Sequence, residues 1–98
     1  MEGISVDSLK LKMKKEGVNI IDIRDNYQYQ LGHIKNARNV PMNFLLTSPD
    51  NYLKKDVTYY LCCEFGTRSN RCVRELNHLG YKTINILGGY QEYKLKSN

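Results

Sequence analysis

Apolar residues near the N-terminus recur at the spacing of a helix. Val6, Leu9 and Met13 are three and four residues apart, and Ser5 stands before them as a capping residue. This pattern predicts a helix over about residues 6–16, with one face buried and the other exposed to solvent.

Short, almost continuous apolar runs follow along the rest of the chain. Such runs are typical of buried strands, and we expect strands at residues 18–23, 37–40, 57–62 and 83–87. Further short helices are predicted at residues 26–31, 42–46 and 90–94, with a surface loop at residues 47–51. Strands that alternate with helices indicate an α/β fold with a largely parallel sheet.

A second long helix is predicted after residues 63–68, ending near Gly80. At roughly 100° per residue, five of its positions fall within one arc of about 120°. We expect this arc to pack on the sheet. Its members are Ser69, Cys72, Val73, Leu76 and Leu79.

Length and composition predict a single domain over residues 1–98. The chain has 98 residues, 41% of them hydrophobic, which is enough for one modest core. No apolar run approaches the roughly 20 residues that cross a bilayer, and the N-terminus lacks the pattern of a secretory signal. Two of the three cysteines are adjacent, which indicates thiol chemistry in a reducing compartment rather than a disulfide framework. We therefore expect a cytoplasmic protein with no membrane partner.

The formal net charge is +5, but the basic residues are dispersed. Lys10, Lys12, Lys14 and Lys15 would point to different sides of the first helix, as on a solvated face. Because phosphate binding requires clustered Lys and Arg, we predict no nucleic-acid partner. The positive balance favours small anionic substrates instead.

A loop that begins with a cysteine joins the third apolar run to the second long helix. Its residues are Cys63, Glu64, Phe65, Gly66, Thr67 and Arg68. In this position backbone N–H groups can surround an anion, and the following helix N-terminus adds roughly half a positive charge. Because such surroundings favour a thiolate, we expect Cys63 to be a nucleophile. Gly66 would let the backbone fold over the sulfur.

Four short motifs occur in an order and spacing that point to a known family. They are the C-x-x-G-x-R-S run at residues 63–69, the D-x-R run at 22–24, the run from Gly32-His33-Ile34 to Pro41, and the glycine pair at 88–89. Together they resemble the single-domain rhodaneses, a family of thiosulfate sulfurtransferases. The resemblance implies a mostly parallel five-stranded sheet with helices on both faces, and a cysteine that cycles between thiol and persulfide. It implies neither a metal nor an organic cofactor.

The resemblance also implies roles for individual residues. Cys63 would carry the sulfur, and Arg68 would close the loop and help to bind an anionic sulfur donor such as thiosulfate. Glu64, Phe65 and Thr67 would lend backbone amides to the loop, and their side chains would set the acceptor preference at its mouth. The acceptor would be a thiol, a protein thiol or cyanide. Supporting residues would be Asp22, Arg24, His33 and Ser69.

Three positions depart from the family pattern. Gln28 stands where the family usually has Glu, which would remove an ionic partner of Arg24. Asn36 replaces a glycine, although Asn is the residue that best tolerates a left-handed backbone after glycine. Tyr93 replaces a Trp, and none of the three lies in the cysteine loop.

Two other functions remain open. The chain could be a sulfur carrier or regulatory binding module that turns over free thiosulfate poorly. Cys62, with Arg68 six residues later, also formally matches the phosphate loop of cysteine phosphatases and arsenate reductases. That match would place the nucleophile inside an apolar strand, so we interpret Cys62 as a core residue.

Other candidate residues have both a structural and a functional interpretation. Cys72 lies on the inward arc of its helix and is interpreted as a core residue, with a resolving thiol as the alternative. His33 is interpreted as structural, with a general base as the alternative. Cys62, Cys63 and His78 lack the spacing of zinc ligands. The sequence leaves the oligomeric state and the physiological sulfur donor and acceptor open.

Overall fold

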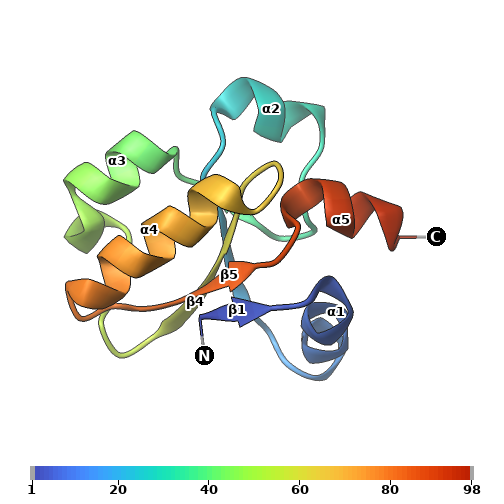
Figure 1. The fold of residues 1–98 in the computed structure, drawn as a ribbon, viewed down its shortest axis with the longest axis horizontal. Helices are drawn as coiled ribbons and strands as arrows, with labels where there is room; N and C mark the ends of the chain where they lie inside the picture. The colour runs from blue at the N-terminus through green and yellow to red at the C-terminus, as the bar shows by residue number, and fades with distance from the viewer. Residues whose placement is uncertain (1, 98) are drawn as a thin grey trace.

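Five parallel strands form one sheet through the centre of the molecule (Figure 1). The computed structural model describes residues 2–97. The strand order is β1-β5-β4-β2-β3, and each neighbouring pair is parallel. The strands are β1 (Gly3–Ile4), β2 (Asn19–Asp22), β3 (Arg38–Asn39), β4 (Thr58–Cys62) and β5 (Lys82–Ile86). The predicted α/β fold with a five-stranded parallel sheet is confirmed.

Helices cover both faces of this sheet. They are α1 (Val6–Lys15), α2 (Asn26–Leu31), α3 (Met42–Thr47), the 3-10 helix η1 (Pro49–Asn51), α4 (Thr67–His78) and α5 (Gly89–Leu95). Figure 1 shows α3 and α4 on one side of the sheet and α1 and α5 on the other. Within residues 2–97, none of the helices combines the length and the apolar character that a membrane crossing requires.

Two apolar clusters fill the spaces between the sheet and its helices. Consecutive residues of a strand point to opposite faces of a sheet, and the central strand β4 contributes to both clusters in this way. Leu61 belongs to the cluster under α3 and α4, whereas Tyr60 belongs to the cluster under α1 and α5. The almost continuous apolar runs of the sequence are explained by this burial on both faces.

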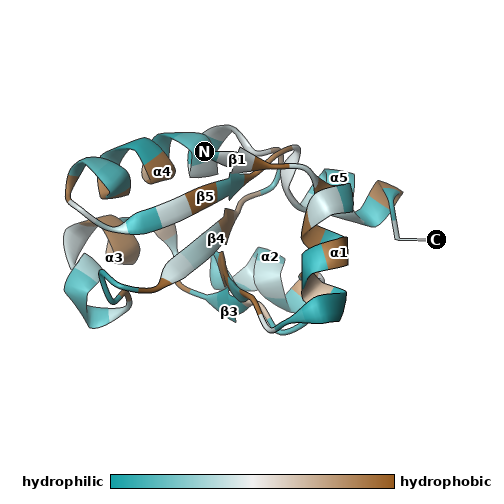
Figure 2. Ribbon diagram, turned by 90° about the horizontal axis from the view of Figure 1, so that it is seen from below, coloured by the Kyte–Doolittle hydropathy of each residue, from teal (hydrophilic) through white to brown (hydrophobic). Residues whose placement is uncertain are grey.

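The first long helix, α1, forms as its sequence predicts. The hydroxyl oxygen of Ser5 accepts a hydrogen bond from the backbone N–H of Ser8 at 3.1 Å, which caps the helix. Val6 and Leu9 are buried against the sheet. Figure 2 shows hydrophobic and hydrophilic residues alternating along α1, as expected for a helix with one buried face.

The second long helix, α4, also packs one face on the sheet, but that face is shorter than predicted. Its buried residues are Ser69, Cys72, Val73 and Leu76. Leu79 was expected on the same face and is instead 52% exposed, because α4 ends at His78 and Leu79 already belongs to the following turn.

The carboxyl ends of three neighbouring strands bring the sequence motifs together. The strands β5, β4 and β2 are adjacent and parallel, and they end at Ile86, Cys62 and Asp22. The segments that follow them therefore start from the same edge of the sheet, which is where α/β proteins place their sites.

Asn36 adopts a φ of 68°, the left-handed conformation expected for it.

Candidate active site

The sulfur of Cys63 lies inside a loop whose backbone donates hydrogen bonds to it. The Sγ atom accepts from the N–H groups of Gly66 at 3.1 Å and Ser69 at 3.3 Å. The hydroxyl oxygen of Ser69 lies 3.1 Å from the same sulfur. Cys63 is only 3% exposed, so the loop and the start of α4 enclose it. Converging N–H groups stabilise negative charge on the atom that they face, which suits a thiolate or a persulfide anion.

Gly66 allows the loop to take this shape. Its φ of 90° is in the left-handed region that favours glycine. A Cβ atom built on Gly66 would also lie 2.9 Å from the backbone nitrogen of Gly88, so there is no room for a side chain. Gly66 thus turns the chain into α4 while its own N–H points at the sulfur.

Asn85 supports the loop from the sheet. The sequence analysis did not identify this residue. It lies in β5 and is 3% exposed. Its Nδ2 donates to the carbonyl oxygen of Gly66 at 3.1 Å, and its Oδ1 accepts from the hydroxyl of Ser69. Both residues that donate backbone N–H groups to the sulfur are therefore held by one side chain. The available signal was a lone amide in an apolar strand, because a buried polar group requires hydrogen-bond partners.

Arg24 joins the end of β2 to the loop. Its Nη2 donates to Asp22 Oδ2 at 2.7 Å and to the carbonyl oxygen of Gly32 at 2.7 Å, and its Nη1 donates to Glu64 Oε1 at 2.9 Å. Its guanidinium carbon also lies 4.5 Å from the ring centre of Tyr90. Burial alone would lower the pKa of Arg24, but the hydrogen bond and charge of Asp22, together with the hydrogen bond to Glu64, raise it above its usual value.

The carboxylate of Glu64 corrects one expectation. Gln28 was expected to leave Arg24 short of an ionic partner, whereas Glu64 supplies that partner from the loop. The Glu64 side chain also accepts a hydrogen bond from Gln91 and remains partly exposed. The hydrogen bond from Gln91, followed by that from Arg24, holds the pKa of Glu64 below its usual value despite partial burial.

The N-terminus of α5 holds the first two loop residues in place. The N–H of Tyr90 donates to the carbonyl oxygen of Cys63 at 2.8 Å, and the N–H of Gln91 donates to that of Glu64 at 3.1 Å. A Cβ atom on Gly89 would lie 2.5 Å from the Cys63 carbonyl oxygen, so the two segments can approach this closely only with glycine there. The late glycine pair therefore packs directly against the cysteine loop.

The other predicted site residues are divided between the loop mouth and a distant position. Phe65 is 69% exposed, and Thr67 and Arg68 are also exposed. His33 instead contacts Tyr29, with its Nδ1 2.8 Å from the carbonyl oxygen and its ring stacked at 3.7 Å. The structure thus gathers Asp22, Arg24 and Ser69 around the loop and places His33 beside α2.

This arrangement can be compared with known proteins. A family model described as a rhodanese-like domain matches residues 5–96. The chain belongs to the rhodanese-like family. The match includes β2, the cysteine loop and the glycine pair, so the elements that meet around Cys63 all lie within this rhodanese-like domain.

Individual relatives of this rhodanese-like domain agree with the family match. Bacillus subtilis YtwF, which is named as a proposed sulfurtransferase, is 30% identical over 92 residues, covering 93% of this chain and 88% of YtwF. The crystal structure of SSP1007 from Staphylococcus saprophyticus has a TM-score of 0.87 and 36% identity, with 95% of this chain and 93% of that chain covered. The human single-domain sulfurtransferase TSTD1 has a TM-score of 0.89 at 20% identity, over 100% and 99% of the two chains, which shows the shared fold.

Several curated relatives are longer than this rhodanese-like domain. The chain spans 23%, 59% and 51% of the length of the first three. It also matches part of mouse M-phase inducer phosphatase 1, at 40% identity over 98 residues, and spans 18% of that protein. The rhodanese-like fold therefore occurs in proteins whose names describe different activities.

The other two thiols of the rhodanese-like domain are buried away from the loop's donors. Burial raises the pKa of Cys62 well above its usual range, and burial raises the pKa of Cys72 to about 12. Both side chains are fully buried, Cys62 in the cluster under α1 and α5 and Cys72 in the cluster under α3 and α4. Within residues 2–97, no group of three or more His, Cys, Asp or Glu side chains has the arrangement of a metal site.

Proposed function

We propose that this rhodanese-like domain is a sulfurtransferase that moves a sulfane sulfur through a persulfide on Cys63. The observation that carries the proposal is the pair of N–H groups, from Gly66 and Ser69, that point at the Cys63 sulfur at 3.1 and 3.3 Å. A loop of this kind stabilises the anionic sulfur both before and after transfer. We further propose that residues 1–98 act as one domain in a reducing, cytoplasmic environment, which the three free thiols favour.

The proposed reaction has two half-reactions. The Cys63 thiolate attacks the outer sulfur of thiosulfate, the sulfur–sulfur bond of the donor breaks, and its electron pair leaves with sulfite. The product is a Cys63 persulfide anion. A thiolate or cyanide acceptor then attacks the outer sulfur of the persulfide, which restores the Cys63 thiolate. A protein persulfide can replace thiosulfate in the first half-reaction, with a thiolate as the leaving group.

Arg68 is proposed to bind the anionic donor. It is exposed at the start of α4, and no ion pair among residues 2–97 involves it. A cation in the first turn of a helix opposes the helix dipole, at a cost of about 0.3 to 1 kcal/mol. Its position is therefore better explained by attraction of an anion than by helix stability.

Two alternatives make different predictions. A carrier or binding module would accept sulfur on Cys63 but would turn over thiosulfate more slowly than the roughly 1 to 10³ per second of typical enzymes. A phosphatase or arsenate reductase would use Cys62 as its nucleophile. The chain's partial match to a phosphatase is the reason to test this alternative. The burial of Cys62, which raises its pKa, argues against a nucleophilic role for that residue.

The deciding experiment is the intact mass of the protein after brief thiosulfate treatment. We expect a gain of about 32 Da, one sulfur atom, that a reductant removes. Cys63→Ser should abolish the adduct and the turnover, whereas Cys62→Ser and Cys72→Ser should retain both. An adduct that persists in Cys63→Ser, or hydrolysis of an aryl phosphate that is lost in Cys62→Ser, would overturn the proposal.

A further inference from the structure

The outer face of α4 carries a row of arginines that begins at the cysteine loop. Arg68, Arg71 and Arg74 are exposed, and at roughly 100° per residue their three-residue spacing spreads them over about 120° of the helix surface. None of the ion pairs among residues 2–97 includes any of the three. Arg68 is in the first turn of α4, where the dipole disfavours cations, so helix stability does not explain its position.

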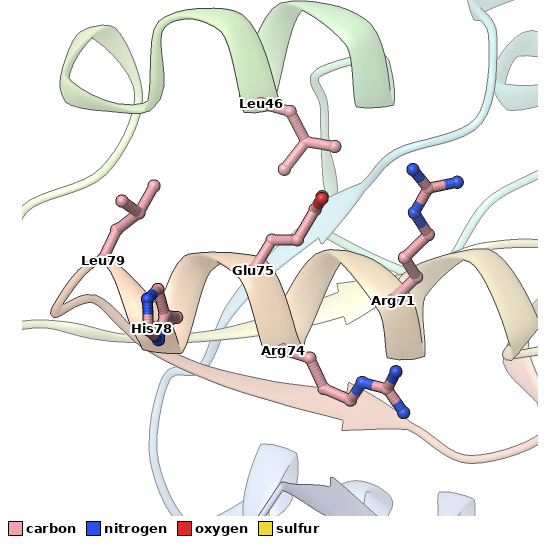
Figure 3. Close-up of a pocket in the computed structure, with 6 residues that line it drawn as sticks. All are labelled: Leu46, Arg71, Arg74, Glu75, His78 and Leu79. Atoms are coloured by element: carbon pink, nitrogen blue, oxygen red, sulfur yellow. The ribbon is translucent and has the colours of Figure 1, made fainter.

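A hollow of about 740 Å³ lies over the same face. It is lined by Leu46, Arg71, Arg74, Glu75, His78 and Leu79. Figure 3 shows Arg71, Glu75 and Leu79 projecting from α4 on the side where Leu46 extends from α3, whereas Arg74, which also lines the hollow, points away from Leu46. Leu46 of α3 and the exposed Leu79 at the end of α4 supply apolar surface to this hollow. We call these lining residues, together with Arg68, the α4 surface.

We propose that the α4 surface docks an extended acidic segment of the protein that exchanges sulfur with Cys63. The inference rests on the proposed function and adds the chemistry of the partner. Cys63 is 3% exposed, so a protein thiol or persulfide that reaches it must contact the exposed loop mouth at Phe65. The chain that leads away from that thiol then passes along α4, where unpaired arginines attract carboxylates and the leucines contact apolar side chains.

The length of α4 defines the segment further. The helix has 12 residues, so its surface is about 18 Å long at roughly 1.5 Å per residue. An extended chain advances about 3.3 Å per residue, so five or six partner residues cover it. We therefore expect the partner to carry acidic residues within about six positions of its sulfur-bearing cysteine.

A protein segment fits this surface better than a nucleic acid. The carboxylate of Glu75 follows Arg74 in the sequence and lines the same hollow. A peptide can place an apolar residue beside Glu75, whereas every nucleotide of a nucleic acid carries a phosphate that Glu75 would repel. Leu46 and Leu79 provide aliphatic contacts, whereas single-stranded nucleic acids are bound through aromatic stacking. Binding of RNA is accordingly an outcome that the test must be able to detect.

The test is direct binding, measured by fluorescence anisotropy with labelled peptides. The acidic probe carries three Glu and two Leu within six positions of a Ser that replaces the sulfur-bearing Cys, and the matched probe has Lys for Glu. The variant is Arg71→Glu with Arg74→Glu. The control is Lys14→Glu with Lys15→Glu, which changes the net charge equally on α1, on the other side of the sheet in Figure 1.

We expect the native protein and the control variant to bind the acidic probe equally, and more tightly than the Lys probe. The arginine variant should bind it at least about tenfold more weakly, and added salt should weaken the native complex. Equal binding by the arginine variant, no binding by the native protein, or tighter binding of a single-stranded RNA oligomer would overturn the proposal. Because the probe cannot accept sulfur, these results are independent of persulfide formation on Cys63.

Discussion

The guanidinium of Arg24 lies 2.9 Å from the carboxylate of Glu64, which ties the end of β2 to the residue that follows Cys63. Arg24 is 6% exposed and also binds Asp22 and the carbonyl oxygen of Gly32. One buried cation therefore connects the sheet, the segment after α2 and the cysteine loop. The directions of the loop's N–H groups depend on its backbone, so this ion pair restrains the groups that face the sulfur.

The first prediction is that Glu64 makes stability depend on pH. Its pKa is lowered from an ordinary value of 4.5, so folding favours the ionised carboxylate. Its stabilising contribution is fully present above the ordinary pKa and is lost as the pH falls through the lowered value in the folded state. We expect Glu64→Gln to be about 1 kcal/mol less stable than the native protein near neutral pH.

Urea unfolding at several pH values checks this prediction. The difference in free energy of unfolding between Glu64→Gln and the native protein should shrink towards zero in acid. Glu75→Gln serves as the control, because Glu75 is exposed on α4 and no ion pair among residues 2–97 involves it. A Glu64→Gln difference that stays constant from neutral pH into acid would contradict the assignment.

The second prediction concerns Asn85, which holds both Gly66 and Ser69. Asn85→Ala should lower the free energy of unfolding by about 1 to 3 kcal/mol, because it leaves buried partners unsatisfied. It should also lower sulfur transfer by at least about tenfold, since the loop loses the side chain that orients its donors.

Thr83→Ala is the matched control for Asn85. Thr83 is in the same strand, is 2% exposed and donates a hydrogen bond to Asn77 at 2.8 Å, at the other end of β5 from the loop. We expect a similar loss of stability with little change in turnover per folded molecule. Equal losses of turnover in both variants would show that Asn85 acts through stability alone.

The third prediction concerns the close approach of α5 to the loop. Gly89 has a φ of 63°, and a Cβ atom there would lie 2.5 Å from the Cys63 carbonyl oxygen. Gly89→Ala should therefore displace the loop and lower the free energy of unfolding by at least about 1 to 2 kcal/mol, the cost of left-handed backbone alone. Gly17→Ala is the control, because nothing lies within 4 Å of a Cβ built there. Thermal unfolding of the two variants measures this difference. An equal loss of stability in Gly89→Ala and Gly17→Ala would refute this account.

The sequence predicted the fold well because burial on both sides of a parallel sheet leaves a clear pattern. The runs at 18–23, 57–62 and 83–87 correspond to β2, β4 and β5 within two residues at each end. The strand β1 has only two residues, Gly3 and Ile4, which is too short to form a hydrophobic pattern. It joins the sheet through pairing with β5, a contact that spacing along the chain does not encode.

The site was predicted less completely than the fold, because its supporting contacts join residues far apart in the sequence. The cysteine loop is a continuous motif, so Cys63 and Gly66 could be identified locally. Asn85 lies 19 residues from Gly66, and Glu64 lies 40 residues from Arg24. Only the fold brings these pairs together, which is why the ion pair between Arg24 and Glu64 was not predicted and Asn85 was missed.

The last prediction distinguishes the three thiols by their reactivity. The N–H groups of Gly66 and Ser69 stabilise negative charge on the Cys63 sulfur, whereas burial raises the pKa of Cys62 above its usual range and the pKa of Cys72 to about 12. Because the thiolate is the nucleophile, iodoacetamide near neutral pH should modify Cys63 first in the folded protein, as located by peptide mass mapping. All three cysteines should react in urea, and Cys63→Ser should remain unmodified in the folded state over the same time. Preferential modification of Cys62 in the folded protein would identify Cys62 as the nucleophile and favour the phosphatase alternative.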